Sequence, residues 1–370
     1  MTNFLISSKY LITALATSLL LTACGGSSSS LSSKDSELNI AATEVIDNTI
    51  IPAAQRFREQ SKALVDKSQI FCAASNTTEE NLMTLKTQWI TTNLAWFELL
   101  PYRFGPMINS EILPTYLFID YHRQRGNNAT DTVRNNIDTL IASNTEAEYN
   151  LTLSRIGASG VGLLALEVLI FEDAENQSLA SADIIAEFNN NSRKCQLLLD
   201  IGNKLLSRAD DVHQGWTTNY RNTGKSYRNL VVNNQLEEVF DDEAGESAIK
   251  KIMVSLQEFY DYLAKRNITS NVAQLSSSTW LALEHSLKTT EELLNGAKST
   301  SISINAIMMN NRFEQTVENI NTHIETLRTA IEEQNITDTK AAAATLDGNF
   351  KRDIPDALNI NLGLNFSDGD

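Results

Sequence analysis

The sequence predicts an all-α protein built from two helical bundles. Only 5 of the 370 residues are proline and 15 are glycine, so few positions interrupt helices. Apolar residues recur at helical spacing along most of the chain, and no stretch shows the sustained alternation that strands require. Apolar residues form 42% of the chain, and its length suits about two domains, each with a core.

Residues 1–23 are typical of a bacterial lipoprotein signal peptide. Lys9 supplies positive charge, a short apolar run follows, and Leu21-Thr22-Ala23-Cys24 has the lipobox pattern in which the cysteine becomes the lipidated N-terminus. Residues 24–36, rich in serine and glycine, are expected to form a flexible tether. Gly25 stands where an aspartate would retain such a lipoprotein in the inner membrane, so we expect the periplasmic face of the outer membrane. An ordinary secretory signal with a chance cysteine is the alternative.

The net charge and the remaining cysteines limit the partners and the compartment. A formal net charge of −16 argues against nucleic acid as a partner, because a phosphate backbone needs a basic footprint. It fits a solvated acidic surface or an affinity for cations. With Cys24 lipidated, Cys72 and Cys195 remain, and in the oxidising periplasm we expect them to form one disulfide. Two free buried thiols are the alternative.

The first half of the chain should contain long helices interrupted by one rigid corner. Pro52 is expected to kink or break the first helix. Thr77-Thr78-Glu79-Glu80 is typical of a helix start, with threonine as the cap. Residues 101–106 hold two prolines and a glycine and should form a rigid aromatic corner, and 107–127 looks irregular or weakly helical. The expected helices cover residues 38–73, 77–100, 130–142, 146–171 and 181–212.

The second half should form another helical bundle. Residues 215–227 are polar and glycine-containing, and they are the expected boundary between domains 37–214 and 215–370. Trp89 and Trp280 lie on helices in separate halves, which suggests a duplicated four-helix bundle. The expected helices here cover residues 228–240, 245–266, 276–296, 302–334 and 337–347.

A single acid interrupts the most apolar helix of the chain. Residues 163–171 are apolar on every face except for Glu167, and a helix apolar all round is buried. A carboxylate there must be paired, hydrogen-bonded, protonated or bound to a metal, because burying a bare charge costs several kcal/mol. We expect Glu98 and Arg103 as its partners, since a buried Glu–Arg pair would keep Glu167 ionised. A salt bridge that only fixes helix packing is the alternative.

Three segments together resemble imelysin-like proteins. Residues 96–106, Trp-Phe-Glu-Leu-Leu-Pro-Tyr-Arg-Phe-Gly-Pro, resemble the family's Trp, acid, Arg-Phe-Gly-Pro segment. Gly162 and Glu167 fit its Gly-x-His-x-x-Glu motif, and residues 354–370 resemble its terminal segment, which closes on Asp-Gly-Asp. The resemblance covers about residues 37–370. It implies two helical bundles with the motif near their interface, and a connection to bacterial iron uptake.

The resemblance also implies a site and a cofactor. In the family motif His and Glu stand three apart on one helical face, where both could hold one metal ion, iron or another divalent cation. Here Leu164 occupies the His position and cannot ligate. The implied ligand-binding residues are Glu98, Arg103, Gly162 and Glu167.

The function that these observations favour is non-enzymatic. We expect an outer-membrane-anchored periplasmic protein that binds a ligand or partner at the bundle interface and supports the iron-uptake machinery. The first alternative is a metallopeptidase, because the family name comes from an insulin-cleaving activity. However, the chain has no His-Glu-x-x-His and no Gly-x-Ser-x-Gly, and no catalytic residue is predicted. The second alternative is a structural or interaction lipoprotein with no small ligand.

Overall fold

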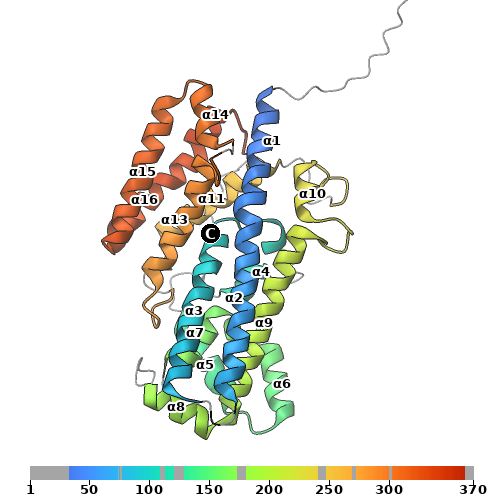
Figure 1. Ribbon diagram of the computed structural model, residues 1–370, viewed down its shortest axis with the longest axis vertical. Helices are drawn as coiled ribbons and strands as arrows, with labels where there is room; N and C mark the ends of the chain where they lie inside the picture. Colours follow the sequence, from blue (N-terminus) through green and yellow to red (C-terminus); the bar gives the residue numbers. More distant parts are fainter. Residues whose placement is uncertain are drawn as a thin grey trace, which may run out of the picture.

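The structure, a computed structural model, confirms the all-α fold class. It describes residues 33–73, 75, 77–108, 113–120, 129–172, 181–240, 247–268, 272–299 and 302–362, and no strand occurs among them (Figure 1). Nor does this part of the chain contain a helix long and apolar enough to cross a bilayer. The predicted signal peptide, Cys24 and the terminal Asp-Gly-Asp lie outside the described residues.

The helices of the first half follow the predicted order, with shorter pieces between them. The first helix begins at Ser33, so residues 33–36, predicted as tether, are helical. The α-helices are α1 (Ser33–Val45), α2 (Ile51–Cys72), α3 (Glu79–Leu99), α4 (Thr115–Ile119), α5 (Ala129–Ile141), α6 (Glu146–Arg155), α7 (Leu163–Phe171), α8 (Ser181–Asn190) and α9 (Ser192–Thr217). Short 3-10 turns lie at Gly105–Met107 and Gly157–Gly160.

The second half is also helical in its described residues. Its helices are α10 (Tyr227–Val232), α11 (Ala248–Lys265), α13 (Thr279–Asn295), α14 (Ile304–Asn310), α15 (Glu314–Glu332), α16 (Ile336–Gly348) and α17 (Ile354–Leu358). The predicted helix over 302–334 is divided between α14 and α15, because Arg312 takes a left-handed conformation with φ of 67°.

The two groups of helices share one continuous core. In the first group α2 packs against α3 and α9, and α7 lies between α3, α5 and α9. In the second group α16 packs against α11 and α15, and α13 contacts α14 and α15. The groups meet where α13 packs on α3 and where α1 reaches α11 and α14 (Figure 1). Buried apolar residues therefore run from one half into the other, and the domain boundary and the duplication remain predictions.

Proline shapes two helices in the same way. A π-helical turn at Ile46–Ile50 joins α1 to α2 and lies directly before Ile51-Pro52. A second π turn at Asn349–Asp353 joins α16 to α17 before Ile354-Pro355. Because a proline inside a helix lacks an N–H and its ring presses on the carbonyl four residues back, the preceding turn widens. The kink predicted at Pro52 is thus a π turn in an otherwise continuous rod.

The long predicted helix over 146–171 is broken by glycines. Gly157 and Gly162 have φ of 65° and 87°, which lies outside the helical range, so α6 ends and α7 starts afresh. The helix predicted over 181–212 is likewise broken at Asn191, whose side chain accepts from the backbone N–H of Arg193 and caps α9.

The predicted disulfide is present between the end of α2 and the start of α9. Cys72 and Cys195 have Cα atoms 5.7 Å apart and are 123 positions apart in the sequence. The bond therefore fastens two of the longest helices of the first group to each other.

Candidate functional site

The start of α7 is fixed by a close backbone contact. Gly162 caps the helix with φ of 87°, and a Cβ there would lie 2.4 Å from the carbonyl oxygen of Ile119. Only glycine combines that conformation with that approach. The indole N–H of Trp89, on α3, also donates to the Leu163 carbonyl at 3.0 Å. Gly162 therefore positions α7 through its backbone.

Glu167 lies in the core, as predicted, with 1% of its surface exposed. Its Oε1 accepts the backbone N–H of Ser276 at 2.9 Å, from the turn that precedes α13. Burial raises the pKa of Glu167 to about 7, the hydrogen bond from Ser276 opposes that rise, and the charges of Asp120 and Glu172 add to it. No ion pair joins Glu167 to another described residue. Near neutral pH this group therefore exists in both protonation states.

A small cavity adjoins the Glu167 carboxyl. The space open to the centre of a water molecule is about 10 Å³, which is room for about one water. Asn93 is 2% exposed, and its Nδ2 has no hydrogen-bond partner among the described residues. Asp120 accepts from the indole N–H of Trp96 at 3.0 Å. The residues lining the cavity are Trp89, Asn93, Asp120, Leu163, Leu164, Glu167, Val272 and Ala273. We call this the Glu167 cavity.

Arg103 does not pair with Glu167, which corrects the expected arrangement. Its guanidinium lies over the ring of Tyr116, 5.4 Å from the centroid, and its Nη2 is 3.8 Å from Glu258. The Nε atom is buried without a hydrogen-bond partner, and burial lowers the pKa of the guanidinium. The backbone N–H of Arg103 donates to the Ser255 hydroxyl at 2.5 Å. Arg103 thus joins the corner to α11.

Glu98 also has other partners. Its carboxylate is 2.5 Å from Arg56 Nη2 and 2.9 Å from His285 Nδ1. Burial opposes ionisation of Glu98, but the hydrogen bond with His285 and the charge of Arg56 outweigh it and lower its pKa. Since His285 belongs to α13, Glu98 joins α3 to the second group of helices. Glu98, Arg103 and Glu167 therefore form three separate contacts between the halves of the chain.

The described residues around Glu167 do not fit a tightly held metal ion. Leu164 lines the cavity one turn before Glu167, so the two side chains share a helix face as their spacing predicts. An apolar side chain at that place offers no ligand. In the described ranges no three His, Cys, Asp or Glu side chains come close enough to hold one ion. Asp120 and Glu167 provide the two carboxylates among the described residues that line the cavity.

Sequence reasoning missed three residues around the Glu167 carboxyl. Asn93 could have been found, because helical spacing places it on the same face as Trp89 and Trp96. Asp120 follows a short helix in a segment predicted to be irregular, and no local pattern marks it as buried. Ser276 reaches Glu167 only through the tertiary fold.

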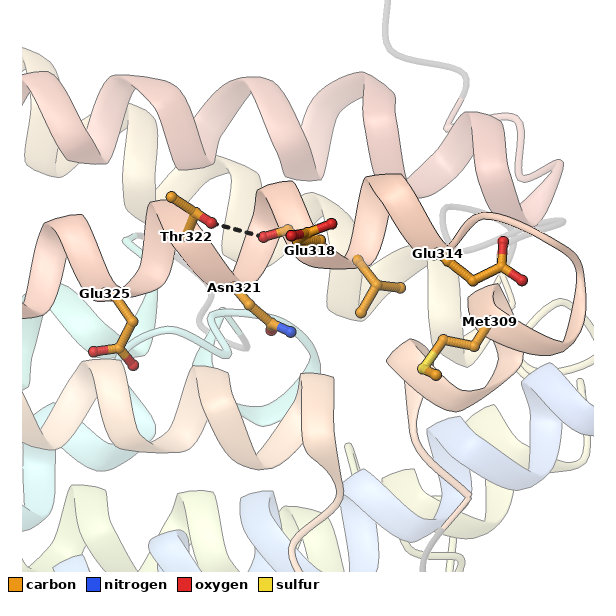
Figure 2. Close-up of a pocket in the computed structure, with 7 residues that line it drawn as sticks. Met309, Glu314, Glu318, Asn321, Thr322 and Glu325 are labelled. Atoms are coloured by element: carbon orange, nitrogen blue, oxygen red, sulfur yellow. Dashed lines mark hydrogen bonds between the residues drawn. The ribbon is translucent and has the colours of Figure 1, made fainter.

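A wider hollow lies along α15 and holds none of the predicted site residues. It has a volume of about 550 Å³, and Figure 2 shows the side chains that surround it. Glu314, Glu318 and Glu325 face it from one side of α15, and the exposed Met309 reaches it from α14. We call this the α15 hollow, an acidic and solvated surface.

Comparison with known proteins identifies similar chains. A family model for imelysin matches residues 50–358. An imelysin-like protein from Psychrobacter arcticum has a similar structure, with a TM-score of 0.63 at 18% identity over 89% of this chain and 98% of that one. A protein from Parabacteroides distasonis, provisionally named iron-regulated protein A precursor, gives a TM-score of 0.60 at 13% identity over 87% and 95%. No curated protein matches. At these identities the solved structures show a shared fold.

Proposed function

Because the chain belongs to the imelysin family, we propose that it is a non-enzymatic periplasmic lipoprotein that supports iron uptake. Cys24 would anchor it to the outer membrane, and the Glu167 cavity would bind a ligand or a partner group. The lipobox supports the anchor, since Leu21-Thr22-Ala23-Cys24 follows a short apolar run. The similar fold of a protein named as iron-regulated supports the connection to iron.

The observation that carries this proposal is the buried acid at the junction of the two helix groups. An apolar residue at position 167 would pack in this core without a desolvation cost. An acid whose pKa is raised to about 7, next to a cavity and a second carboxylate, is a candidate for binding. The space matches a single small group, namely a water molecule or one donor or cationic group held between Asp120 and Glu167.

Complementation under iron limitation tests the proposed role. A strain that lacks this protein would be complemented with the wild type, Glu167→Ala or Glu318→Gln, and grown in iron-limited and iron-replete media. Glu318 is an exposed acid on the α15 hollow, so its variant is a control for mutation away from the cavity. We expect the control and the wild type to restore growth in limited iron, and Glu167→Ala to fail. Full rescue by Glu167→Ala, or a deletion without an iron-dependent defect, contradicts the proposal.

The purified variants separate a lost site from a lost fold. Glu167→Ala should keep the helical circular-dichroism spectrum and the cooperative melt of the wild type, because the substitution removes a costly buried group. A failed rescue together with an unfolded protein would instead assign Glu167 a packing role.

The anchor is tested separately. Cells fed an alkyne analogue of palmitate should label the wild type, which should sediment with outer membranes. Cys24→Ser should take up no label and should no longer sediment with outer membranes. Equal labelling of the two proteins would exclude Cys24 as the lipidation site.

A further inference from the structure

A second polar pocket lies between α15 and the π turn that leads to α17. Its volume is about 280 Å³, close to the lower end of the range for small-molecule sites. Residues 316, 319 and 323 place it on the face of α15 opposite the hollow shown in Figure 2. The lining residues are Phe313, Thr316, Asn319, His323, Asn349, Asp353, Asp356 and Ala357. We call it the His323 pocket.

Three of these side chains form a directed hydrogen-bond chain. Asn349 Nδ2 donates to Asp353 Oδ2 at 2.6 Å, and Asn349 Oδ1 lies 2.9 Å from His323 Nδ1. A carboxylate only accepts, so the amide nitrogen of Asn349 must face Asp353. The amide oxygen must then accept from His323, which places the imidazole proton on Nδ1. In the neutral ring Nε2 is therefore an acceptor, and it is the ring nitrogen left for a ligand.

The backbone holds these three hydrogen-bonded side chains rigidly. Asn349 and Asp353 are the first and last residues of the π turn that Pro355 imposes, and Asn349 is 3% exposed. A buried amide with both ends engaged cannot rotate without losing two hydrogen bonds. π turns of this kind are frequent at functional sites.

The lining of the pocket selects for a donor-rich cation. Asp353 and Asp356 provide negative charge, His323 provides an acceptor nitrogen, and the described residues that line the pocket include no lysine or arginine. Phe313, 37% exposed, adds an aromatic ring on which a cation can rest. A bare metal ion fits less well, because no three ligating side chains of the described residues converge on one point. We propose that the His323 pocket binds a small organic cation that carries N–H donors, namely a primary ammonium or a guanidinium group.

The first test asks whether the imidazole has the assigned tautomer. The protein has only four histidines, so the His323 signals are identified by their loss in His323→Asn. Long-range ¹H–¹⁵N correlation spectra of the unprotonated ring should show its single N–H proton on Nδ1. A proton on Nε2 would remove the acceptor on which the proposal rests and overturn it.

The second test uses matched cations as probes. We expect n-butylammonium and methylguanidinium to shift the His323 Cε1–H resonance saturably, and tetramethylammonium, which has the charge but no N–H, to leave it unchanged. Asp356→Asn should weaken n-butylammonium binding about tenfold, because one charge-assisted hydrogen bond is lost. Glu318→Gln, which removes the same charge from the opposite face of α15, should bind as the wild type. Equal shifts with all three cations, or no saturable shift with any, would overturn the proposal.

Discussion

Replacing Glu167 by glutamine should make stability less dependent on pH. The glutamine Oε1 can still accept the Ser276 N–H that Glu167 accepts at 2.9 Å, so the variant keeps the hydrogen bond and loses only the titration. In the wild type the folded protein holds a proton on Glu167 at pH values where the unfolded chain has released it, because burial raises the pKa.

The size and the sign of the effect follow from the raised pKa. A rise from 4.5 to about 7 corresponds to about 3 kcal/mol of penalty on the ionised form. Below pH 4.5 the group is protonated in both the folded and the unfolded state and contributes nothing. Between 4.5 and 7 the unfolded state binds fewer protons, so the stability of the wild type falls by up to about 3 kcal/mol, and above 7 the loss is complete.

Urea denaturation of the wild type and Glu167→Gln near pH 5 and near pH 8 measures this difference. We expect similar unfolding free energies near pH 5, and near pH 8 a variant more stable by up to about 3 kcal/mol. Other titrating groups are common to both proteins and cancel in the comparison. Glu318→Gln, an exposed control, should follow the wild type at both pH values. If the wild type and Glu167→Gln differed in unfolding free energy by the same amount at both pH values, the reasoning would be refuted.

Further substitutions test what holds the helices of the first group in place. Gly162→Ala should destabilise the protein by more than about 2 kcal/mol in chemical denaturation, because its Cβ would lie 2.4 Å from the Ile119 carbonyl. Gly157→Ala is the control, because Gly157 also has a positive φ but a Cβ there would meet nothing within 4 Å, so it should lower the unfolding free energy by only about 1 kcal/mol. Equal losses of stability in the two variants would contradict the steric explanation. Replacing Cys72 and Cys195 together by alanine should lower stability by about 5 kcal/mol on the chain-entropy account of a loop this long, and an unchanged urea midpoint would count against it.

The fold and the family could be predicted because their signals are local. Scarce proline and glycine, together with helical apolar spacing, predicted an all-α chain, and three short segments predicted the imelysin family. The positions at which helices break inside polar or glycine-rich stretches were harder to predict from the sequence. Arg312 interrupts a helix through its left-handed backbone, and Asn191 does so by capping the start of α9. In both cases the broken and the continuous helix differ little in free energy, so the local sequence does not decide between them.

The electrostatic partners could not be predicted because they depend on the tertiary fold. The burial of Glu167 was predicted from its apolar neighbours in the sequence, and that prediction needs no knowledge of the tertiary fold. Its partner was expected to be Arg103, yet Ser276, more than a hundred residues away, provides the hydrogen bond. Arg103 instead faces Tyr116 and Glu258. A sequence identifies which charge needs a partner, whereas the packing of helices decides which partner it finds.

A carboxyl-carbon NMR titration of glutamate-labelled protein measures Glu167 most directly. If this acid is enclosed where the two helix groups meet, one carboxyl resonance should titrate with a pKa of about 7 and disappear in Glu167→Gln. If the resonance lost in that variant instead titrates like an exposed glutamate, with a pKa near 4.5, then water reaches position 167, and the binding site proposed there does not exist.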